Sequence, residues 1–487
     1  MTAAWHLLAP PLLAGPSGES GPRTWMRILD YGIISSLLVV PLSVFIFYQL
    51  GPFPSLFFQQ ACFFTLPALL LAFKLTSHRG GRRRGLKVTG WYFAFVGYGL
   101  AAAFLFGPRA EWGQVKHYVY LLYWMSLVSV FLATSRQPAA YYLNRMRLLF
   151  VHIGYAALLF LAVHALTPFR PPVVPMVGSQ YASSFLNVTY SFLPWFGGRV
   201  PRFSFLYIEP RIAGNMMILG LFLQCGWIGA LRRAGRPTHK ACWNLAVILF
   251  SFLVIYSYLA LLELAVAAVC IGLTALFRRE AVVWAVLLAG CLAGSLALAV
   301  WVNFGSSPIA LGSLRQELTG VSLQLGSVLE EKTGKEATAG NFDEHFRVRL
   351  DGMVNLAADP LGRGIRYFNA SAGEAPAEPG SSNNSFGNLY IHAGVLGLAG
   401  AVWLVRRLLS MLRQSARAPD PMLVWGCRMA LFAILFSTVA DSVSLSMWFY
   451  FLLFLLELGR QDLQRRGRVV FYPSNPEMWS GGSRARA

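Results

Sequence analysis

CWNLAVILFSFLVIYSYLALLELAVAAVCIGLTALF, residues 242–277, is the stretch that decides how this chain folds. It contains a single charged residue, Glu263, and basic residues flank it on both sides. One continuous helix over these 36 residues would measure about 54 Å, far more than the roughly 30 Å of hydrocarbon in a bilayer. The stretch therefore predicts two membrane crossings with a break near Ser257–Tyr258, which leaves both basic flanks on one side.

The rest of the chain has the composition of a membrane protein. Of its 487 residues, 56% are hydrophobic and 13% are charged, against about 25% charged residues in soluble domains. The net charge is +20, but the basic residues form short clusters between apolar blocks. Positive-inside topology explains such clusters better than binding to nucleic acid. The six cysteines match neither a disulfide framework nor a zinc site.

Apolar blocks near the length needed to cross a bilayer, about 20 residues, recur along the chain. They cover 31–50, 55–73, 88–107, 117–134, 148–167, 205–231, 242–257, 259–277, 281–303, 386–405, 422–440 and 446–459. The predicted fold is therefore an all-α polytopic membrane protein with about 12 transmembrane helices. A large, partly helical loop precedes the tenth helix.

Short basic clusters orient this predicted bundle. Each cluster follows an even number of crossings, which places both termini in the cytoplasm. The clusters lie within 23–27, 74–87, 136–147, 232–240, 278–279, 406–417 and 460–468. The predicted regions are a cytoplasmic tail at 1–30, helices at 31–303 and 386–459, and a basic cytoplasmic tail at 460–487.

The same parity places two loops on the outer, non-cytoplasmic side of the membrane. The larger, 304–385, has 10 acidic and 7 basic residues, and within it 344–358 has the pattern of an amphipathic surface helix. The smaller, 168–204, is rich in proline, glycine and aromatic residues. Neither loop carries a phosphate-binding glycine motif or a paired-acid metal motif, which argues against an ATP-driven pump and a metal-dependent transferase.

Two arginines flank the predicted outer end of the sixth helix. Arg202 and Arg211 begin and end RFSFLYIEPR, in which Pro210 suits a first helical turn. A helix N-terminus is the positive end of the helix dipole, and arginines beside it favour a diphosphate group. The alternative is that both side chains only anchor the helix at lipid headgroups.

Further candidate residues follow in and around the large loop. Arg347 and Arg349 precede the turn sequence PLGRG at 360–364, and they are either diphosphate ligands or ordinary surface arginines. Glu263 is an acid inside an apolar block, so it is either functional or the partner of an arginine.

A third cluster, SNNSFGNLYIHAGVLG at 382–397, opens the tenth helix. Its serine and asparagine run suits a helix N-cap, and Asn383 and Asn384 are candidates for binding sugar hydroxyls. His392 is either a base or a structural residue of the bundle. Gly394 and Gly397 are expected to permit close helix packing.

The order and placement of these motifs resemble the O-antigen ligase and Wzy-type O-antigen polymerase superfamily. The family's Arg…Glu-Pro stretch looks like Arg202 to Pro210, and its Arg…Pro-x-x-Gly-x-Gly element looks like Arg347 or Arg349 through Gly364. Its third element looks like 383–397. Two positions depart from the pattern, because the family's histidine falls on Asn383 and its acid falls on His392.

The resemblance implies a glycosyltransferase of the bacterial inner membrane that acts on the periplasmic side without metal or cofactor. It would polymerise undecaprenyl-diphosphate-linked oligosaccharide units into an O-antigen, capsule or exopolysaccharide. Membrane lipid and a chain-length regulator protein are the other expected partners. The diphosphate ligands would be Arg202, Arg211, Arg347 and Arg349, and the base would be Glu209 or His392.

Other functions remain open at this point. A ligase that moves the glycan to lipid A core or to a protein would use the same donor site. A lipid-linked glycan transporter, or flippase, would line a path through the whole membrane with polar residues. A scaffold without catalytic activity is the third alternative.

Overall fold

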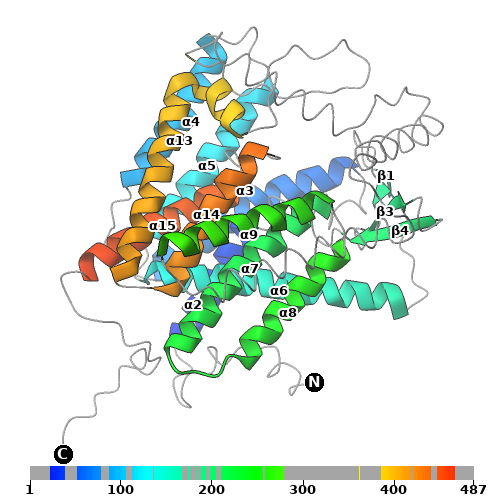
Figure 1. Cartoon of the computed structure of the whole chain (residues 1–487). Helices are drawn as coiled ribbons and strands as arrows, with labels where there is room; N and C mark the ends of the chain where they lie inside the picture. The colour runs from blue at the N-terminus through cyan, green and yellow to red at the C-terminus, as the bar shows by residue number, and fades with distance from the viewer. Residues whose placement is uncertain are drawn as a thin grey trace, which may run out of the picture.

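The computed structural model describes most of the predicted helices. The residues described are 22–38, 52–77, 87–105, 112–134, 137–166, 174–175, 182–183, 188–193, 198–203, 210–255, 258–278, 361, 385–417, 420–439 and 447–466. These residues are almost entirely helical (Figure 1). The predicted ninth helix, 281–303, and the predicted surface helix, 344–358, lie outside them.

Eleven α-helices in the described residues overlap eleven of the twelve predicted blocks. They are α2 (Pro22–Leu38), α3 (Pro52–Ser77), α4 (Lys87–Leu105), α5 (Trp112–Ala133), α6 (Ala139–Leu166), α7 (Pro210–Arg233), α8 (His239–Ile255), α9 (Tyr258–Arg278), α13 (Ser385–Arg417), α14 (Pro421–Val439) and α15 (Met447–Arg466). Helix α2 begins nine residues before its predicted block, inside the region assigned to the N-terminal tail.

Several of these helices have the length and hydropathy of membrane spans. Within the described residues, three segments are long and apolar enough to cross a membrane: Ala139–Val163, Ala213–Arg233 and Gly394–Gln414. Shorter apolar helices lie within α3, α4, α5, α9 and α14. The chain is therefore a membrane-associated helical protein, and the full number of crossings stays a prediction.

The predicted break in the stretch 242–277 is confirmed. Helix α8 ends at Ile255 and α9 begins at Tyr258. The start of α8 is fixed by Gln224, whose Nε2 donates a hydrogen bond to the Ala241 carbonyl oxygen at 2.6 Å. The end of α9 is fixed by Thr274, whose Oγ1 accepts a hydrogen bond from Arg428 Nε at 3.0 Å.

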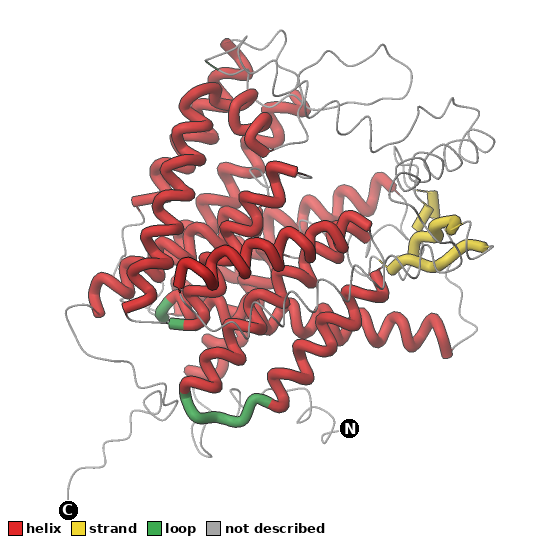
Figure 2. Tube along the Cα trace, viewed as in Figure 1, coloured by secondary structure: helices red, strands yellow, loops and turns green. Residues whose placement is uncertain are grey.

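One end of the bundle, the linker end, holds the short basic connection after α7. A Cβ placed on Gly229, near the end of α7, would lie 3.3 Å from Pro421, the first residue of α14. A Cβ on Gly459 of α15 would lie 3.4 Å from Ala139, the first residue of α6. Figure 2 shows the linker after α7 at the lower edge of the molecule, away from the strands. Helix α8 thus starts at the linker end, and α9 finishes there.

Helix α7 lies at the centre of the described bundle, in contact with α6, α8, α9 and α14. Its Phe222 ring stacks on Phe432 of α14 with ring centroids 5.3 Å apart. Its Gly220 lets Phe150 of α6 approach so closely that an added Cβ would lie 2.8 Å from that side chain. Such small residues at helix interfaces are typical of membrane bundles.

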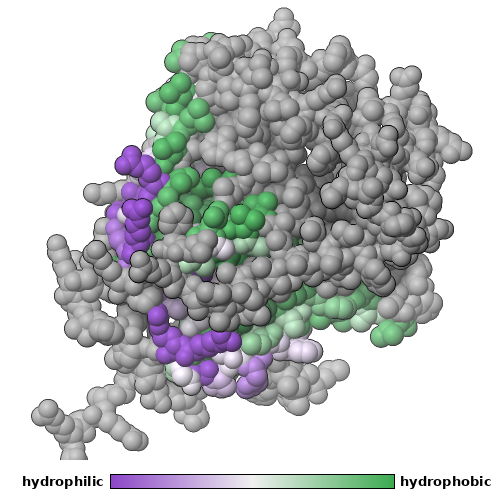
Figure 3. Space-filling view, in the orientation of Figure 1, coloured by the Kyte–Doolittle hydropathy of each residue, from purple (hydrophilic) through white to green (hydrophobic). Residues whose placement is uncertain are grey.

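Large apolar side chains also face outward from the bundle. The exposed ones include Leu69 and Phe73 on α3, Leu159 and Leu166 on α6, Trp243 and Phe250 on α8, and Leu396 and Val402 on α13. Figure 3 shows apolar side chains along the surface, with hydrophilic side chains gathered at its left and lower edges. Surfaces this apolar are unusual in soluble monomers and suit contact with lipid.

The prediction of an all-α fold needs one correction, because four short strands lie between α6 and α7. They are β1 (Val174–Pro175), β2 (Ala182–Ser183), β3 (Val188–Leu193) and β4 (Gly198–Phe203). Strand β1 pairs with β2, and β3 pairs with β4, both antiparallel, with β3 and β4 in register from Val188↔Phe203 to Leu193↔Gly198. The β-branched and aromatic residues of β3 favour this conformation. Strand β4 contacts α8.

Helix α13 is broken at Gly394, where φ is 54° and ψ is −139°. Only glycine readily adopts this conformation. Glycine at position 394 therefore lets the backbone turn, a conformation that the sequence analysis did not predict. The shorter first part of α13 leaves the line of the long second part, as Figure 1 shows.

Candidate functional site

Two buried charged residues at the linker end pair with each other. Lys74 Nζ lies 2.6 Å from Asp30 Oδ1, and both side chains are buried. The Tyr141 hydroxyl donates to Asp30 Oδ2 at 3.2 Å, and the Lys74 ammonium lies 4.3 Å from the centre of the Phe131 ring. This cluster joins α2, α3, α5 and α6, so it holds helices together rather than offering a binding site.

A second buried cluster surrounds Arg147 on α6. Its Nε donates to Asn144 Oδ1 and its Nη1 donates to Gln224 Oε1, both at 2.7 Å. The sequence placed Arg145 and Arg147 in a cytoplasmic connection, but both lie inside α6 and are buried. The burial of Arg147 depends on tertiary contacts, because its partner Gln224 belongs to another helix, α7.

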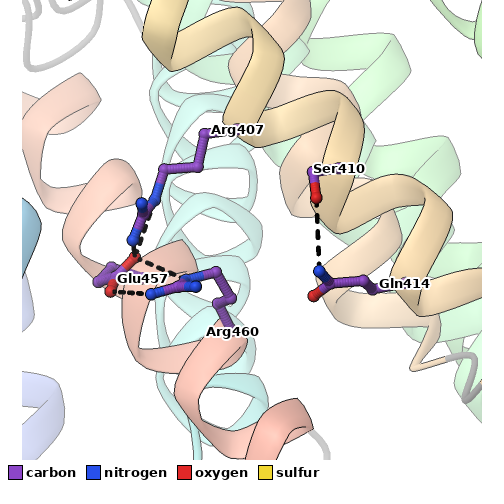
Figure 4. Close-up of polar contacts among 5 residues, drawn as sticks. All are labelled: Arg407, Ser410, Gln414, Glu457 and Arg460. Carbon is purple, nitrogen blue, oxygen red and sulfur yellow. Dashed lines mark hydrogen bonds and ion pairs between the residues drawn. The ribbon is translucent and has the colours of Figure 1, made fainter.

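A third cluster joins α13 and α15 through Glu457, a buried acid that contacts two arginines (Figure 4). Arg407 Nη2 lies 2.5 Å from Glu457 Oε2, and Arg460 Nη2 lies 3.1 Å from Oε1. On the same stretch of α13, Gln414 donates to Ser410 Oγ at 3.4 Å, apart from this cluster.

Helix starts at the linker end are capped by acids. Asp462 Oδ2 accepts a hydrogen bond from the Ala139 backbone N–H of α6 at 2.9 Å. Asp420 Oδ1 accepts one from the Met422 backbone N–H of α14 at 3.1 Å. Carboxylates are favourable at helix N-termini. A candidate substrate site is therefore better sought at the opposite end of the bundle.

The first motif lies at that opposite end. Arg202 is a residue of β4, in register with Thr189 of β3, and Arg211 is in the first turn of α7 directly after Pro210. Arg211 is thus at a helix N-terminus. Residues 204–209, which join β4 to α7, lie outside the described residues, so the pairing of the two arginines stays a prediction. Glu209 lies outside the described residues.

The other predicted residues are only partly placed. Arg347, Arg349, Asn383 and Asn384 lie outside the described residues. His392 lies in α13, two residues before the break at Gly394. The three helices that carry Arg211, Glu263 and His392 share one neighbour, α14, which contacts α7, α9 and α13.

Glu263 lies on α9 and is fully buried. It is the sixth residue of α9, and α9 begins at the end opposite the linker. Helix α9 contacts α7, whose N-terminus carries Arg211. The predicted acid therefore belongs to a neighbour of the helix that carries the first motif.

Asn215 on α7 is a site residue that the sequence analysis missed. It is the sixth residue of α7, four after Arg211, so the two lie on the same helix face. Its side chain is 8% exposed, and its Oδ1 has no hydrogen-bond partner among the described residues. A buried amide oxygen without a partner requires an explanation, and a ligand group is one. The signal in the sequence was an amide inside a largely apolar helix, which also contains the amide Gln224.

The second motif touches the bundle at a single described residue, Leu361. Its carbonyl oxygen accepts a hydrogen bond of 2.7 Å from the Tyr98 hydroxyl of α4. Helix α4 also contacts α13, which carries the third motif. Helix α4 is thus in contact with the second motif, at Leu361, and with the helix that carries the third motif.

Metal ligands do not gather in the described part of the chain, where no three His, Cys, Asp or Glu side chains form a group that would hold an ion. The candidate residues instead offer guanidinium groups, a helix N-terminus, an amide and a carboxylate. Such groups suit an anionic substrate with hydroxyl groups.

Comparison with known proteins gives no family assignment. No family model matches this chain, and no curated protein matches it in sequence.

Proposed function

We propose that this protein is a glycosyltransferase that polymerises undecaprenyl-diphosphate-linked oligosaccharide units at the periplasmic face of the bacterial inner membrane. The observation that supports the proposal is the position of Arg211 in the first turn of α7, at the end opposite the linker, with Arg202 on β4, the described element that precedes this helix. A lipid diphosphate needs such groups, because negative charge develops on it as it leaves.

The proposed reaction is a substitution at the anomeric carbon of the donor. An acceptor hydroxyl on the next lipid-linked unit attacks this carbon, and the bond from the carbon to the diphosphate oxygen breaks. The electron pair leaves with the diphosphate, and the hydroxyl proton passes to a base. Glu209 and His392 are the two candidates for that base.

The remaining candidate residues have supporting roles in this proposal. Arg347 and Arg349 would add positive charge around the diphosphate. Asn383, Asn384, Glu263 and the newly identified Asn215 would bind sugar hydroxyls. The proposal involves no metal and no cofactor.

The proposed topology has twelve crossings with both termini in the cytoplasm. It is supported by the linker end, where Arg232, Arg233 and Arg236 are exposed beside the connection after α7. Basic residues in short connections favour the cytoplasmic side. The large loop, 304–385, and the strands β1 to β4 would then be periplasmic.

Two alternatives share parts of this description. A ligase that transfers the glycan to lipid A core or to a protein would use the same diphosphate site with a different acceptor. A flippase is favoured by one observation, the break in α13, because transporters often bind substrate at interrupted helices. Against it, the charged clusters at the linker end are internally paired rather than free to line a path.

Reconstitution in liposomes with lipid-linked repeat units tests the proposal. The variant Arg211→Ala is compared with Arg236→Ala, which removes an exposed arginine from the linker end. Loss of a group that stabilises transition-state charge lowers the rate by about 100-fold or more, so Arg211→Ala should lose most product. Arg236→Ala should retain it. Equal product from both variants, at matched protein levels, would contradict the assignment of the diphosphate site.

A further inference from the structure

Within the described residues, the side chain of Tyr98 forms a hydrogen bond that joins the bundle to the large loop. Its hydroxyl donates to the Leu361 carbonyl oxygen at 2.7 Å, across 263 residues of sequence. Leu361 belongs to the turn sequence PLGRG at 360–364 and follows Arg349 by twelve residues. Its side chain is 56% exposed, so its attachment to α4 depends on the backbone rather than on burial of the side chain.

The helix on which Tyr98 lies is held firmly in the bundle. Tyr98 packs against the core of buried residues, and Tyr92, six residues earlier, is buried. The Tyr92 ring lies 5.1 Å from the Tyr450 ring and 5.5 Å from the Phe454 ring, both on α15. A group that is hydrogen-bonded to Tyr98 is therefore attached to a fixed part of the molecule.

Helix α4 also contacts α13, on which His392 and the break at Gly394 lie. A backbone carbonyl beside an apolar bundle needs a donor, and a tyrosine hydroxyl supplies one while its ring stays among apolar side chains. The hydrogen bond of Tyr98 thus holds Leu361, which belongs to the second motif, at α4. The same helix contacts α13, which carries the third motif.

We propose that Tyr98 is a positioning residue that anchors the large loop at Leu361 to α4, beside α13. The inference rests on the proposed function for its consequence, which is that the second motif, at Leu361, is held at a helix that contacts the helix of the third motif. The anchor itself is a property of the fold and is measured separately from activity.

Photocrosslinking of the full-length protein in membranes measures the anchor. The photoreactive amino acid p-benzoylphenylalanine is introduced at position 361, and crosslinked peptides are identified by mass spectrometry. Crosslinks should map to α4 (Lys87–Leu105). Tyr98→Phe, which removes only the hydroxyl, should lower their yield about three- to tenfold, the range expected for one hydrogen bond. Absence of crosslinks to α4, or a yield unchanged by Tyr98→Phe, would overturn the anchor.

Kinetics of glycan transfer measure its consequence. Tyr123→Phe is the matched control, because the Tyr123 hydroxyl also donates to a backbone carbonyl of another element, that of Phe64 on α3. Tyr98→Phe should raise the KM for the lipid-linked donor several-fold, whereas Tyr123→Phe should leave it unchanged. A loss of folded protein would lower only the apparent kcat, so an unchanged KM in Tyr98→Phe would overturn the positioning role.

The two experiments separate this inference from the proposed function. Crosslinks to α4 in a wild-type protein that transfers no glycan would leave the anchor standing and contradict the glycosyltransferase. Full transfer activity without crosslinks to α4 would contradict the anchor and leave the glycosyltransferase standing.

Discussion

Asp30 and Lys74 come from α2 and α3, and their side chains meet at 2.6 Å with almost no exposure to solvent. The hydroxyl of Tyr141 completes the coordination of the carboxylate. Two buried charges are costly to remove from water, and their mutual contact offsets that cost only while both are present. This pair therefore has a structural role that can be separated from the proposed chemistry at the opposite end.

Replacing one member of the pair should be worse than replacing both. Asp30→Asn leaves the Lys74 ammonium buried without its carboxylate, which costs about 3–5 kcal/mol. Asp30→Asn combined with Lys74→Met removes both charges and should recover most of that loss. Thermal unfolding in detergent measures the difference. Equal losses of Tm in the single and double variants would show that the pair is not coupled.

The partners of individual buried residues could not be predicted from the sequence. Arg145 and Arg147 read as part of a basic connection, because their pattern resembles the other short clusters. The structure buries Arg147 against Gln224, a residue 77 positions away. The hydropathy pattern of a single chain does not show which helices become neighbours. For the same reason, the sequence did not identify Asn215 as a buried amide.

Elements were more predictable than their partners. The break between Ile255 and Tyr258 followed from the thickness of a bilayer, a constraint that holds whatever surrounds the helix. The strands β3 and β4 were missed because six-residue strands among prolines and glycines give only a weak local pattern. The break at Gly394 was missed because glycine in a membrane helix more often marks close packing.

Close helix packing does occur at Gly459, where α15 meets α14. A Cβ at this position would clash with the Leu423 side chain, whereas a Cβ on Gly272 of α9 would meet nothing within 4 Å. Gly459→Ala should therefore cost about 1–3 kcal/mol by overpacking. Gly272→Ala should be neutral or slightly stabilising, because alanine favours the helix. Thermal unfolding of the two variants compares them directly, and a Gly459→Ala protein as stable as Gly272→Ala would contradict the packing of α14 against α15.

At the scale of the whole molecule, the bundle has two unlike ends. The linker end carries paired buried charges and capped helices that hold the fold together. The opposite end carries Arg211 at the start of α7, the buried Asn215 and the buried Glu263. Sequence parity likewise predicts two unlike ends, with the short basic connections on the cytoplasmic side, and this orientation stays a prediction. Which side chains converge there depends on tertiary contacts, which a single sequence does not reveal.

The central claim is that glycan transfer releases a lipid diphosphate at the start of α7. The most direct measurement incubates the purified protein with undecaprenyl-diphosphate-linked repeat units and follows free undecaprenyl diphosphate and glycan length together. The wild-type protein should release one undecaprenyl diphosphate for each repeat unit that it adds, whereas Arg211→Ala should release little. Glycan-linked lipid that stays intact with the wild-type protein, or is only moved across the bilayer, would contradict it.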